Sequence, residues 1–316
     1  MKSLTAKIVL TTLIALLVAH ANAQYPNKPV RLIVPFAAGD ALDGSARVLA
    51  DLLAPVLGQQ IIVDNRAGAA GAIAAEVVAK GPADGYTLLY GTTAMITITP
   101  YVRKVAYDPA ELDAVARVSA LTALVAVNKD FPAKTLAEFV AEAKKNPGKF
   151  SYATAGEGTL LHLIGESLQS TLGIKLLHVP YKGMAPAVTD FLSGQINVFI
   201  EPVVLSHIQA GRGTALAVIG DKRLQEIPNA PTMKELGIPF NATAWFGIFV
   251  PKGTQRTAVD KLASGISSVI GRSEFASKLP PAVFPAFQSA EQFAKTIEAD
   301  RTMYRTVIKQ LDLKLD

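Results

Sequence analysis

Short apolar runs alternate with amphipathic segments along most of the chain. Residues 30–36 (VRLIVPF) are almost all apolar, which predicts a strand covered on both faces. Apolar residues then recur at helical spacing from Ala46 to Leu57, which predicts a helix that Gly58 ends. The same order continues with a strand over 60–64, a helix to about residue 80 and a strand over 86–90.

The region after residue 130 repeats this order. Thr135 and Glu138 form a Thr-x-x-Glu capping box, and Gly173, Gly194 and Gly211 are placed to end helices. Further strands are predicted over 150–154, 176–179, 196–200 and 215–219. Alternation of strands and helices at this spacing predicts an α/β protein with parallel sheets and right-handed crossovers.

Two further apolar stretches, 121–127 (LTALVAV) and 245–250 (WFGIFV), have no flexible Gly/Ser linker beside them. We interpret them as strands that cross between two domains, one outward and one back. The first domain is then discontinuous, covering 24–125 plus 246–316, and the second covers 126–245. A last helix over about 290–309 is expected to pack back on the first domain.

The first 23 residues are typical of a secretory signal peptide. A short basic region precedes an apolar run over 8–18, and Ala21-Asn22-Ala23 is a small-x-small cleavage site. We therefore expect export to the periplasm with cleavage after Ala23. The sequence contains no cysteine, which excludes disulfide, thiolate-metal and cysteine-linked lipid chemistry.

Charge and motifs narrow the function further. The net charge of +5 falls to about +3 without Lys2 and Lys7, and the basic residues are scattered, so no nucleic-acid partner is expected. The sequence has no zinc-protease, nucleophile-elbow or P-loop motif. Gly156-x-Gly158 lacks the third glycine of a dinucleotide fingerprint. We expect no catalytic residues, no cofactor and no metal.

Two Gly-rich loops each follow a predicted strand and lead into a helix: 35–43 (PFAAGDALD) and 153–162 (ATAGEGTLLH). Ligands bind at the carboxyl ends of parallel strands, and free amides at a helix N-terminus favour an anion. Micromolar binding needs about 8 kcal/mol, and each charge-assisted hydrogen bond supplies about 1.5–3 kcal/mol. We predict that both loops bind one small molecule between the domains; the alternative is that they are ordinary turns of α/β units.

Several blocks, in order, carry a family resemblance across nearly all of the chain after residue 23. They include YPNKPVRLIVPFAAG (25–39), VDNRAGAAG (63–71), PADGYTLL (82–89), HVPYKG (178–183) and Trp245-x-Gly247. In these blocks the chain resembles the tripartite tricarboxylate transporter substrate-binding (Bug) family of periplasmic solute-binding proteins. The resemblance implies a fold like the type II periplasmic binding proteins, with two doubly wound α/β domains joined by two crossing strands.

The resemblance also implies a binding site without catalytic residues. In the family, the first loop and the Ala-Gly-x-Gly loop grip a carboxylate, largely through backbone amides and waters, and the protein delivers organic acids to a membrane transporter. Carried onto this sequence, the gripping positions are Phe36, Ala38 and Gly39, then Thr154, Ala155, Gly156, Glu157, Gly158 and Thr159.

Two residues depart from the family pattern by adding negative charge. Asp40 stands where a second glycine is usual, and Glu157 stands where a small, apolar or amide residue is usual. Two unit charges about 4 Å apart repel by about 1 kcal/mol in water, or about 4 kcal/mol at an effective dielectric near 20. Asp40 either points to solvent or caps its helix, or pairs with an ammonium or hydroxyl group, or marks a site for a neutral or aromatic ligand.

The remaining candidates flank the two loops. We expect Asp43 to cap its helix and brace the first loop, and His162 to be a structural hydrogen-bonding residue more than a ligand contact. Lys182 either offsets the added acids or is an ordinary surface lysine. Thr92, Thr93, Tyr181 and Glu201 are candidates because they lie at the ends of predicted strands.

The predicted function is that of a monomeric periplasmic binding protein. It closes around a small organic acid or related polar metabolite and hands it to membrane transporter subunits. One alternative is a ligand-loaded sensor that docks on a membrane kinase. Another is a hydrolase that uses Asp40, Asp43 and Glu157. The sequence does not identify the ligand.

Overall fold

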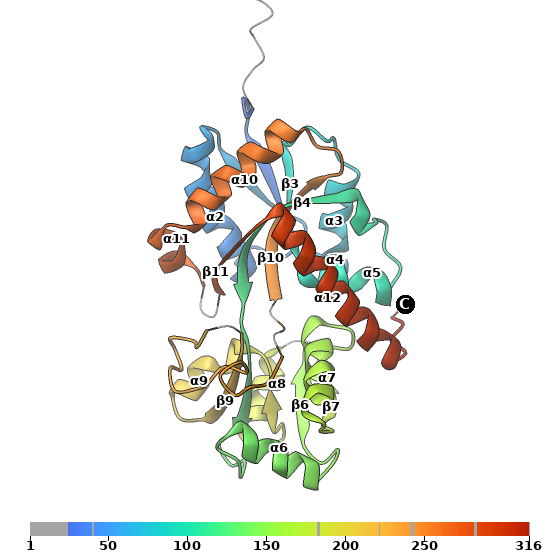
Figure 1. The fold of residues 1–316 in the computed structure, drawn as a ribbon, viewed down its shortest axis with the longest axis vertical. Helices are drawn as coiled ribbons and strands as arrows, with labels where there is room; N and C mark the ends of the chain where they lie inside the picture. The colour runs from blue at the N-terminus through green and yellow to red at the C-terminus, as the bar shows by residue number, and fades with distance from the viewer. Residues whose placement is uncertain are drawn as a thin grey trace, which may run out of the picture.

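The computed structural model describes residues 25–39, 41–181, 184–220, 222–240, 242, 244–280 and 283–315. The predicted signal peptide and the candidates Asp40 and Lys182 lie outside these residues. Two β-sheets, each with helices on both faces, form two domains that lie one above the other in Figure 1.

The first domain is built on a six-stranded sheet in the order β11-β4-β10-β3-β1-β2. Its strands are β1 (Val30–Val34), β2 (Ile61–Asn65), β3 (Thr87–Thr92), β4 (Leu112–Leu121), β10 (Ala244–Pro251) and β11 (Val283–Ser289). Its helices are α2 (Ala41–Leu57), η1 (Ala69–Gly71), α3 (Ala72–Ala79), α4 (Thr93–Thr97), α5 (Thr99–Val102), η2 (Pro109–Glu111), α10 (Arg256–Ile270), α11 (Ser273–Lys278) and α12 (Ala290–Gln310).

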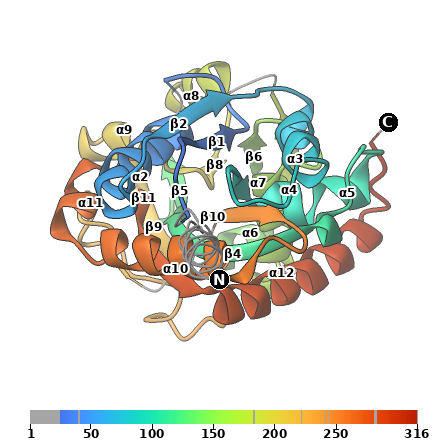
Figure 2. The ribbon, with the colours of Figure 1, turned by 90° about the horizontal axis from the view of Figure 1, so that it is seen from above.

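Both faces of the central strands of this sheet are buried, which explains why β1, β3 and β10 are mostly apolar. Successive side chains of a strand point to opposite faces. Leu32 packs in a cluster with α2 and α10, whereas its neighbour Ile33 packs with α3 and α4. In the view from above, α2, α10 and α11 lie on one side and α3, α4 and α5 on the other (Figure 2).

The second domain is built on a five-stranded sheet in the order β7-β6-β8-β5-β9. Its strands are β5 (Ala123–Asn128), β6 (Ser151–Thr154), β7 (Leu177–Pro180), β8 (Val198–Phe199) and β9 (Gly213–Ile219). Its helices are α6 (Leu136–Lys145), α7 (Leu160–Leu172), α8 (Met184–Ser193), η3 (Pro202–Val204) and α9 (Leu205–Gln209). One core cluster lies under α6 and α7, and the other lies under α8 and α9.

Several local predictions are confirmed. The capping box forms, with the Thr135 hydroxyl accepting from the Glu138 amide at 3.2 Å while the Glu138 carboxylate accepts from the Thr135 amide. Gly173 ends α7 in the left-handed region with φ of 62°. Gly194 and Gly211 also have positive φ values, of 87° and 71°. These backbone conformations favour glycine because it has no Cβ.

The prediction that both sheets are parallel is wrong for five of the nine strand pairings in the described part of the chain. β1, β2 and β3 are mutually parallel, as are β6, β7 and β8. However, β10 runs antiparallel to β3 and β4, β11 runs antiparallel to β4, and β5 runs antiparallel to β8 and β9. For β5 and β10 the cause is the crossing between domains, because a chain that enters a sheet from the other domain runs against the strands that end at that edge.

The stretch predicted as one crossing strand is two strands. β4 ends at Leu121 in the first sheet, and β5 begins at Ala123 in the second, so the chain changes sheets at the buried Thr122. The return stretch becomes β10, which belongs wholly to the first sheet. The exact domain boundaries at 125/126 and 245/246 stay predictions.

The last helix packs on the first domain as predicted, and it also reaches the second. α12 contacts α4, β4 and β11, and its later part contacts α7 (Figure 1). Tyr304, Val307 and Ile308 belong to the core cluster under α6 and α7. The helix therefore runs along the seam between the two domains.

Candidate functional site

The carboxyl ends of the parallel strands in both sheets lie at the edge where the chain passes between the domains. β10 begins beside the end of β3, where Phe246 pairs with Thr92. In the second sheet β5 begins beside the end of β8, where the Leu124 amide donates to the Ile200 carbonyl. The loops that follow β1 and β6 therefore leave edges that face each other across the crossing strands (Figure 1). This is the end of an α/β sheet at which ligands bind.

A buried carboxylate holds the first loop in place. Asp43 is only 2% exposed and accepts hydrogen bonds from the Gly39 amide and from Arg47 Nε, both at 2.9 Å. Asn65 Nδ2 donates to Asp43 Oδ1 and to the Phe36 carbonyl, again at 2.9 Å each. Asp43 braces the loop, but it does not cap the helix as predicted: α2 begins at Ala41, so Asp43 lies in its first turn.

These partners also fix the charge of Asp43. Burial acts to raise the pKa of this carboxyl group, but the hydrogen bonds from Arg47, Asn65 and the Gly39 amide outweigh it and hold the pKa below its ordinary value. Asp43 is thus ionised at neutral pH and its acceptors are occupied. A group in this state is a structural brace rather than a general acid.

The outer part of the first loop is open to solvent. Phe36 is half-buried, whereas Ala38 and Gly39 are exposed. Gly39 has φ of +90°, a conformation that L side chains rarely adopt, although nothing lies within 4 Å of where its Cβ would be. The loop shape therefore depends on glycine here for backbone reasons and not for lack of space.

The second loop is held by hydroxyl groups at both of its ends. Thr154, the last residue of β6, accepts from the Gly156 amide at 3.2 Å. Thr159 donates to the Gly156 carbonyl at 2.8 Å and caps α7 by accepting from the His162 amide. The side chains of Ala155 and Glu157 are exposed, while Gly156, Gly158 and Thr159 are half-buried.

Two stacked histidines lie behind this loop. The rings of His162 and His178 are 4.0 Å apart between centroids and tilted by only 11°. His162 Nδ1 accepts a hydrogen bond from the Gly158 amide at 3.1 Å, and His178 Nε2 pairs with the Thr154 hydroxyl at 2.7 Å. His162 is therefore a structural hydrogen-bonding residue here, as expected, and it has a histidine partner that the sequence did not reveal.

Both rings are neutral at physiological pH. Burial, and to a smaller extent the neighbouring His162, lowers the pKa of His178 to about 4. Burial also lowers the pKa of His162, against the opposing effect of Glu166 and Glu157. Neutrality matters for the loop, because only an unprotonated Nδ1 can accept the hydrogen bond from Gly158.

Glu201 follows β8 at the same sheet edge as the second loop. Among the residues that the structure describes, its buried Oε2 atom has no hydrogen-bond partner. Burial raises the pKa of this carboxyl group to about 7. The sequence placed Glu201 at a strand end, but nothing in it indicated that the carboxyl group would be buried and unpaired.

The other candidates at strand ends have partners within the protein. Tyr181 donates its hydroxyl hydrogen to Asp190 Oδ2 at 2.6 Å. The Thr92 side chain caps α4. Thr93 is fully buried, and its hydroxyl accepts a hydrogen bond from the Trp245 amide at 2.8 Å. It therefore braces β10, and the prediction that its side chain lines the site is wrong.

Within the described ranges, no group of three His, Cys, Asp or Glu residues is arranged to hold a metal ion. None of the helices in that part of the chain combines the length and the hydropathy that a bilayer crossing requires.

Comparison with solved structures defines the class of protein: the architecture is that of a periplasmic binding protein, which confirms the predicted fold class. MatC from Rhodopseudomonas palustris, solved with bound malate, is 27% identical with a TM-score of 0.70, covering 90% of this chain and 100% of that one. An R. palustris protein solved with adipate is 31% identical with a TM-score of 0.76, covering 92% and 99%.

The sequence comparisons then give the family. Residues 45–313 match the family described as "Tripartite tricarboxylate transporter family receptor". Protein BugT of Bordetella pertussis is 39% identical over 241 residues, which are 73% of this chain and 72% of that one. The chain belongs to the tripartite tricarboxylate transporter receptor family, and its predicted similarity to Bug proteins is confirmed.

Proposed function

We propose that this protein is a periplasmic receptor that binds a small carboxylate between its two domains and delivers it to a tripartite tricarboxylate-type membrane transporter. The observation that carries the proposal is the placement of two Gly-rich loops on facing sheet edges, each fixed from behind by a side chain of its own domain. Asp43 holds the Gly39 amide, and His162 holds the Gly158 amide. The remaining amides of both loops are the proposed ligand donors, because fixed donors need no reordering when an anion binds.

A dicarboxylate is the ligand class that the relatives favour. The R. palustris structures hold malate and adipate, which share two carboxylates at different separations. With a pKa raised to about 7, Glu201 carries only part of a negative charge near neutral pH. It would then donate a hydrogen bond to a ligand carboxylate or accept one from a ligand hydroxyl group. The exposed Glu157 remains a source of repulsion, and the three interpretations of Asp40 stay open.

The hydrolase alternative loses support from the state of Asp43. Its two oxygens accept three hydrogen bonds, and its pKa is held low. A general acid near neutral pH needs a raised pKa and an accessible proton. We therefore propose a non-enzymatic receptor. No observation favours the sensor alternative over transport.

A pair of matched glycine variants tests the proposal. Gly39→Ala and Gly58→Ala each place a methyl group at a positive φ, +90° and +73°, with nothing within 4 Å of it. Each should cost about 1 kcal/mol of stability. Only Gly39→Ala should also weaken the binding of a carboxylate ligand, because only Gly39 belongs to the proposed site.

The measurement is calorimetric titration of the mature protein with malate and adipate, with the corresponding diamides as uncharged controls. Asp40→Gly is tested with the same panel, since it should strengthen dicarboxylate binding if Asp40 faces the ligand. We expect at least one dicarboxylate to bind and to raise the melting temperature, since a ligand of the folded form stabilises it. Equal effects of the two glycine variants on affinity would contradict the proposed site.

A further inference from the structure

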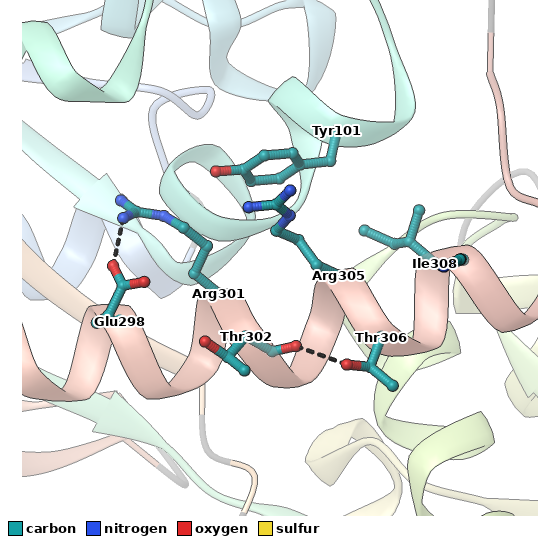
Figure 3. Close-up of a pocket in the computed structure, with 8 residues that line it drawn as sticks. Tyr101, Glu298, Arg301, Thr302, Arg305, Thr306 and Ile308 are labelled. Carbon is teal, nitrogen blue, oxygen red and sulfur yellow. Dashed lines mark hydrogen bonds and ion pairs between the residues drawn. The ribbon is translucent and has the colours of Figure 1, made fainter.

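Three basic residues form a stripe on the outer face of α12. Arg301, Arg305 and Lys309 follow one another at intervals of four residues, which places them on one face of the helix over about 12 Å. Together with Tyr101 of α5 they line a surface pocket of about 460 Å³. Figure 3 shows the Arg305 side chain beneath the Tyr101 ring and the Arg301 side chain turned toward Glu298. We call Arg301, Arg305 and Lys309 the basic stripe.

The charges of the basic stripe are only partly neutralised. Glu298 is the one acidic residue that lines the pocket, and it pairs with Arg301 Nη1 at 2.5 Å. Within the described residues, neither Arg305 nor Lys309 forms an ion pair with a carboxylate. Among the same residues, the buried Nε of Arg301 has no hydrogen-bond acceptor. The pocket thus presents an excess of positive charge to solvent.

Only one of the three basic residues is explained by a contribution to the stability of the helix. A positive side chain in the last turn of a helix interacts favourably with the helix dipole, which explains Lys309. Arg301 and Arg305 lie further from the end. Arg305 is held with its guanidinium 5.1 Å from the centre of the Tyr101 ring, a cation–π arrangement that fixes its direction.

The shape of the surface favours a protein segment over a small molecule. Small-molecule sites enclose most of their ligand's surface. Here Thr302, Arg305, Thr306 and Lys309 are all exposed along a single helix. Such an open row of donors fits an elongated acidic segment, whose carboxylates would meet the cations in turn.

The basic stripe also lies where a partner would meet both domains. α12 contacts α4 and β4 in the first domain, and its later part contacts α7 in the second. Ile308 lines the pocket and also belongs to the core cluster under α6 and α7. A partner docked on the stripe is therefore in a position to distinguish arrangements of the two domains.

We propose that the basic stripe docks an acidic, water-exposed segment of the membrane transporter that receives the solute. This inference rests on the proposed function, because it assumes that a transporter is the partner.

The test uses the full mature protein and a labelled, end-blocked peptide of about twelve residues, helical in design, with glutamates spaced four residues apart to match the stripe. A second peptide has glutamine at those positions. Binding is followed by fluorescence anisotropy at low and high salt, since exposed charge contacts weaken as salt rises. Malate and adipate are titrated in parallel, and vesicles containing phosphatidylglycerol are a separate arm.

We expect the glutamate peptide to bind and the glutamine peptide to bind at least about tenfold more weakly. Arg305→Glu with Lys309→Glu should lower the affinity for the glutamate peptide by about tenfold or more. The matched control is Lys252→Glu with Lys261→Glu, two exposed lysines outside the stripe. It makes the same change in net charge and should alter the affinity by less than about twofold.

Equal losses in the two double variants, or equal binding of the two peptides, would overturn the docking proposal. Binding of the vesicles in preference to the peptide would also overturn it, and would assign the stripe to a lipid surface. The titrations with malate and adipate judge the proposed function separately. If malate or adipate binds normally to the Arg305→Glu/Lys309→Glu variant while the glutamate and glutamine peptides bind equally, only the docking proposal fails. If neither malate nor adipate binds to the wild type or to any variant, the proposed function fails.

Discussion

Acidification should act on this protein through two partly buried groups, His178 and Glu201, whose effects on stability have opposite signs. The folded pKa of His178 is lowered from 6.5 to about 4 by burial and by His162. Below pH 6.5 His178 is protonated in the unfolded chain but stays neutral in the folded protein. The free energy of unfolding therefore falls as the pH drops from about 6.5 to about 4. At pH 5.5, one unit below the unfolded pKa, the loss is about 1 kcal/mol.

Glu201 works in the other direction. Burial raises its folded pKa from 4.5 to about 7, so the folded protein takes up a proton before the unfolded chain does. Stability therefore rises as the pH drops from about 7 to about 4.5. At pH 5.5, one and a half units below the folded pKa, the gain is about 2 kcal/mol relative to pH 8. In the wild-type protein the two contributions oppose each other.

Single substitutions should separate them. In His178→Gln only Glu201 remains of the two groups. We expect the free energy of unfolding of this variant to rise by about 2 kcal/mol when the pH is lowered from 8 to 5.5, relative to a protein without either group. Glu201→Gln leaves His178, and it should lose about 1 kcal/mol over the same range. The free energy of unfolding is measured by urea titration at both pH values, and the slopes with pH are compared rather than the absolute stabilities.

The comparison of slopes removes the contributions of groups that contact neither His178 nor Glu201, because these are common to the proteins; His162 stacks on His178 and is counted with it. Parallel pH profiles for His178→Gln and Glu201→Gln would refute the reasoning. They would mean that neither group is desolvated in the folded protein to the extent that the structure indicates.

Two further predictions concern the braces of the loops. Asp43→Ala should lower the free energy of unfolding by about 2 kcal/mol in urea titrations, because it removes the charged acceptor of Arg47, Asn65 and the Gly39 amide. A loss no larger than that of the exposed Asp51→Ala on the same helix would contradict this. Gly158→Ala should lower the melting temperature, because the new methyl group meets both a φ of +69° and the side chain of Leu315. Adding Leu315→Ala should restore part of the loss by removing the contact, and the absence of any recovery would assign the whole effect to the backbone.

The elements with strong local patterns could be predicted from the sequence. The capping box at Thr135 and the C-terminal Gly173 depend on a few neighbouring residues, so the sequence shows them directly. The direction of the crossing strands could not be predicted in this way. An apolar run such as that of β10 has the same pattern whether its neighbours are parallel or antiparallel.

The site shows the same division between local and non-local information. The loops could be predicted because glycine next to a strand end is a local feature. The pairing of His162 with His178 depends on the register of β6 with β7, where Tyr152 lies beside His178, and on the packing of α7 over both strands. The burial of Glu201 depends on the surrounding strands and is equally non-local. These are the contacts that determine the pKa values, so the electrostatics of the site needed the structure.

The two loops therefore differ in how they respond to pH, although both offer amides at a sheet edge. The brace of the first loop is an ionised carboxylate whose pKa is held below its ordinary value, so it survives mild acidification. The brace of the second loop is a neutral imidazole, and protonation of His162 at Nδ1 would remove the acceptor of the Gly158 amide. Acid should then loosen only the second domain's half of the proposed site. A ligand held mainly by the first loop would keep its affinity at low pH, whereas one held by both would lose it. The pH dependence of affinity, compared between wild type and His162→Gln, thus reports which loop supplies the binding energy.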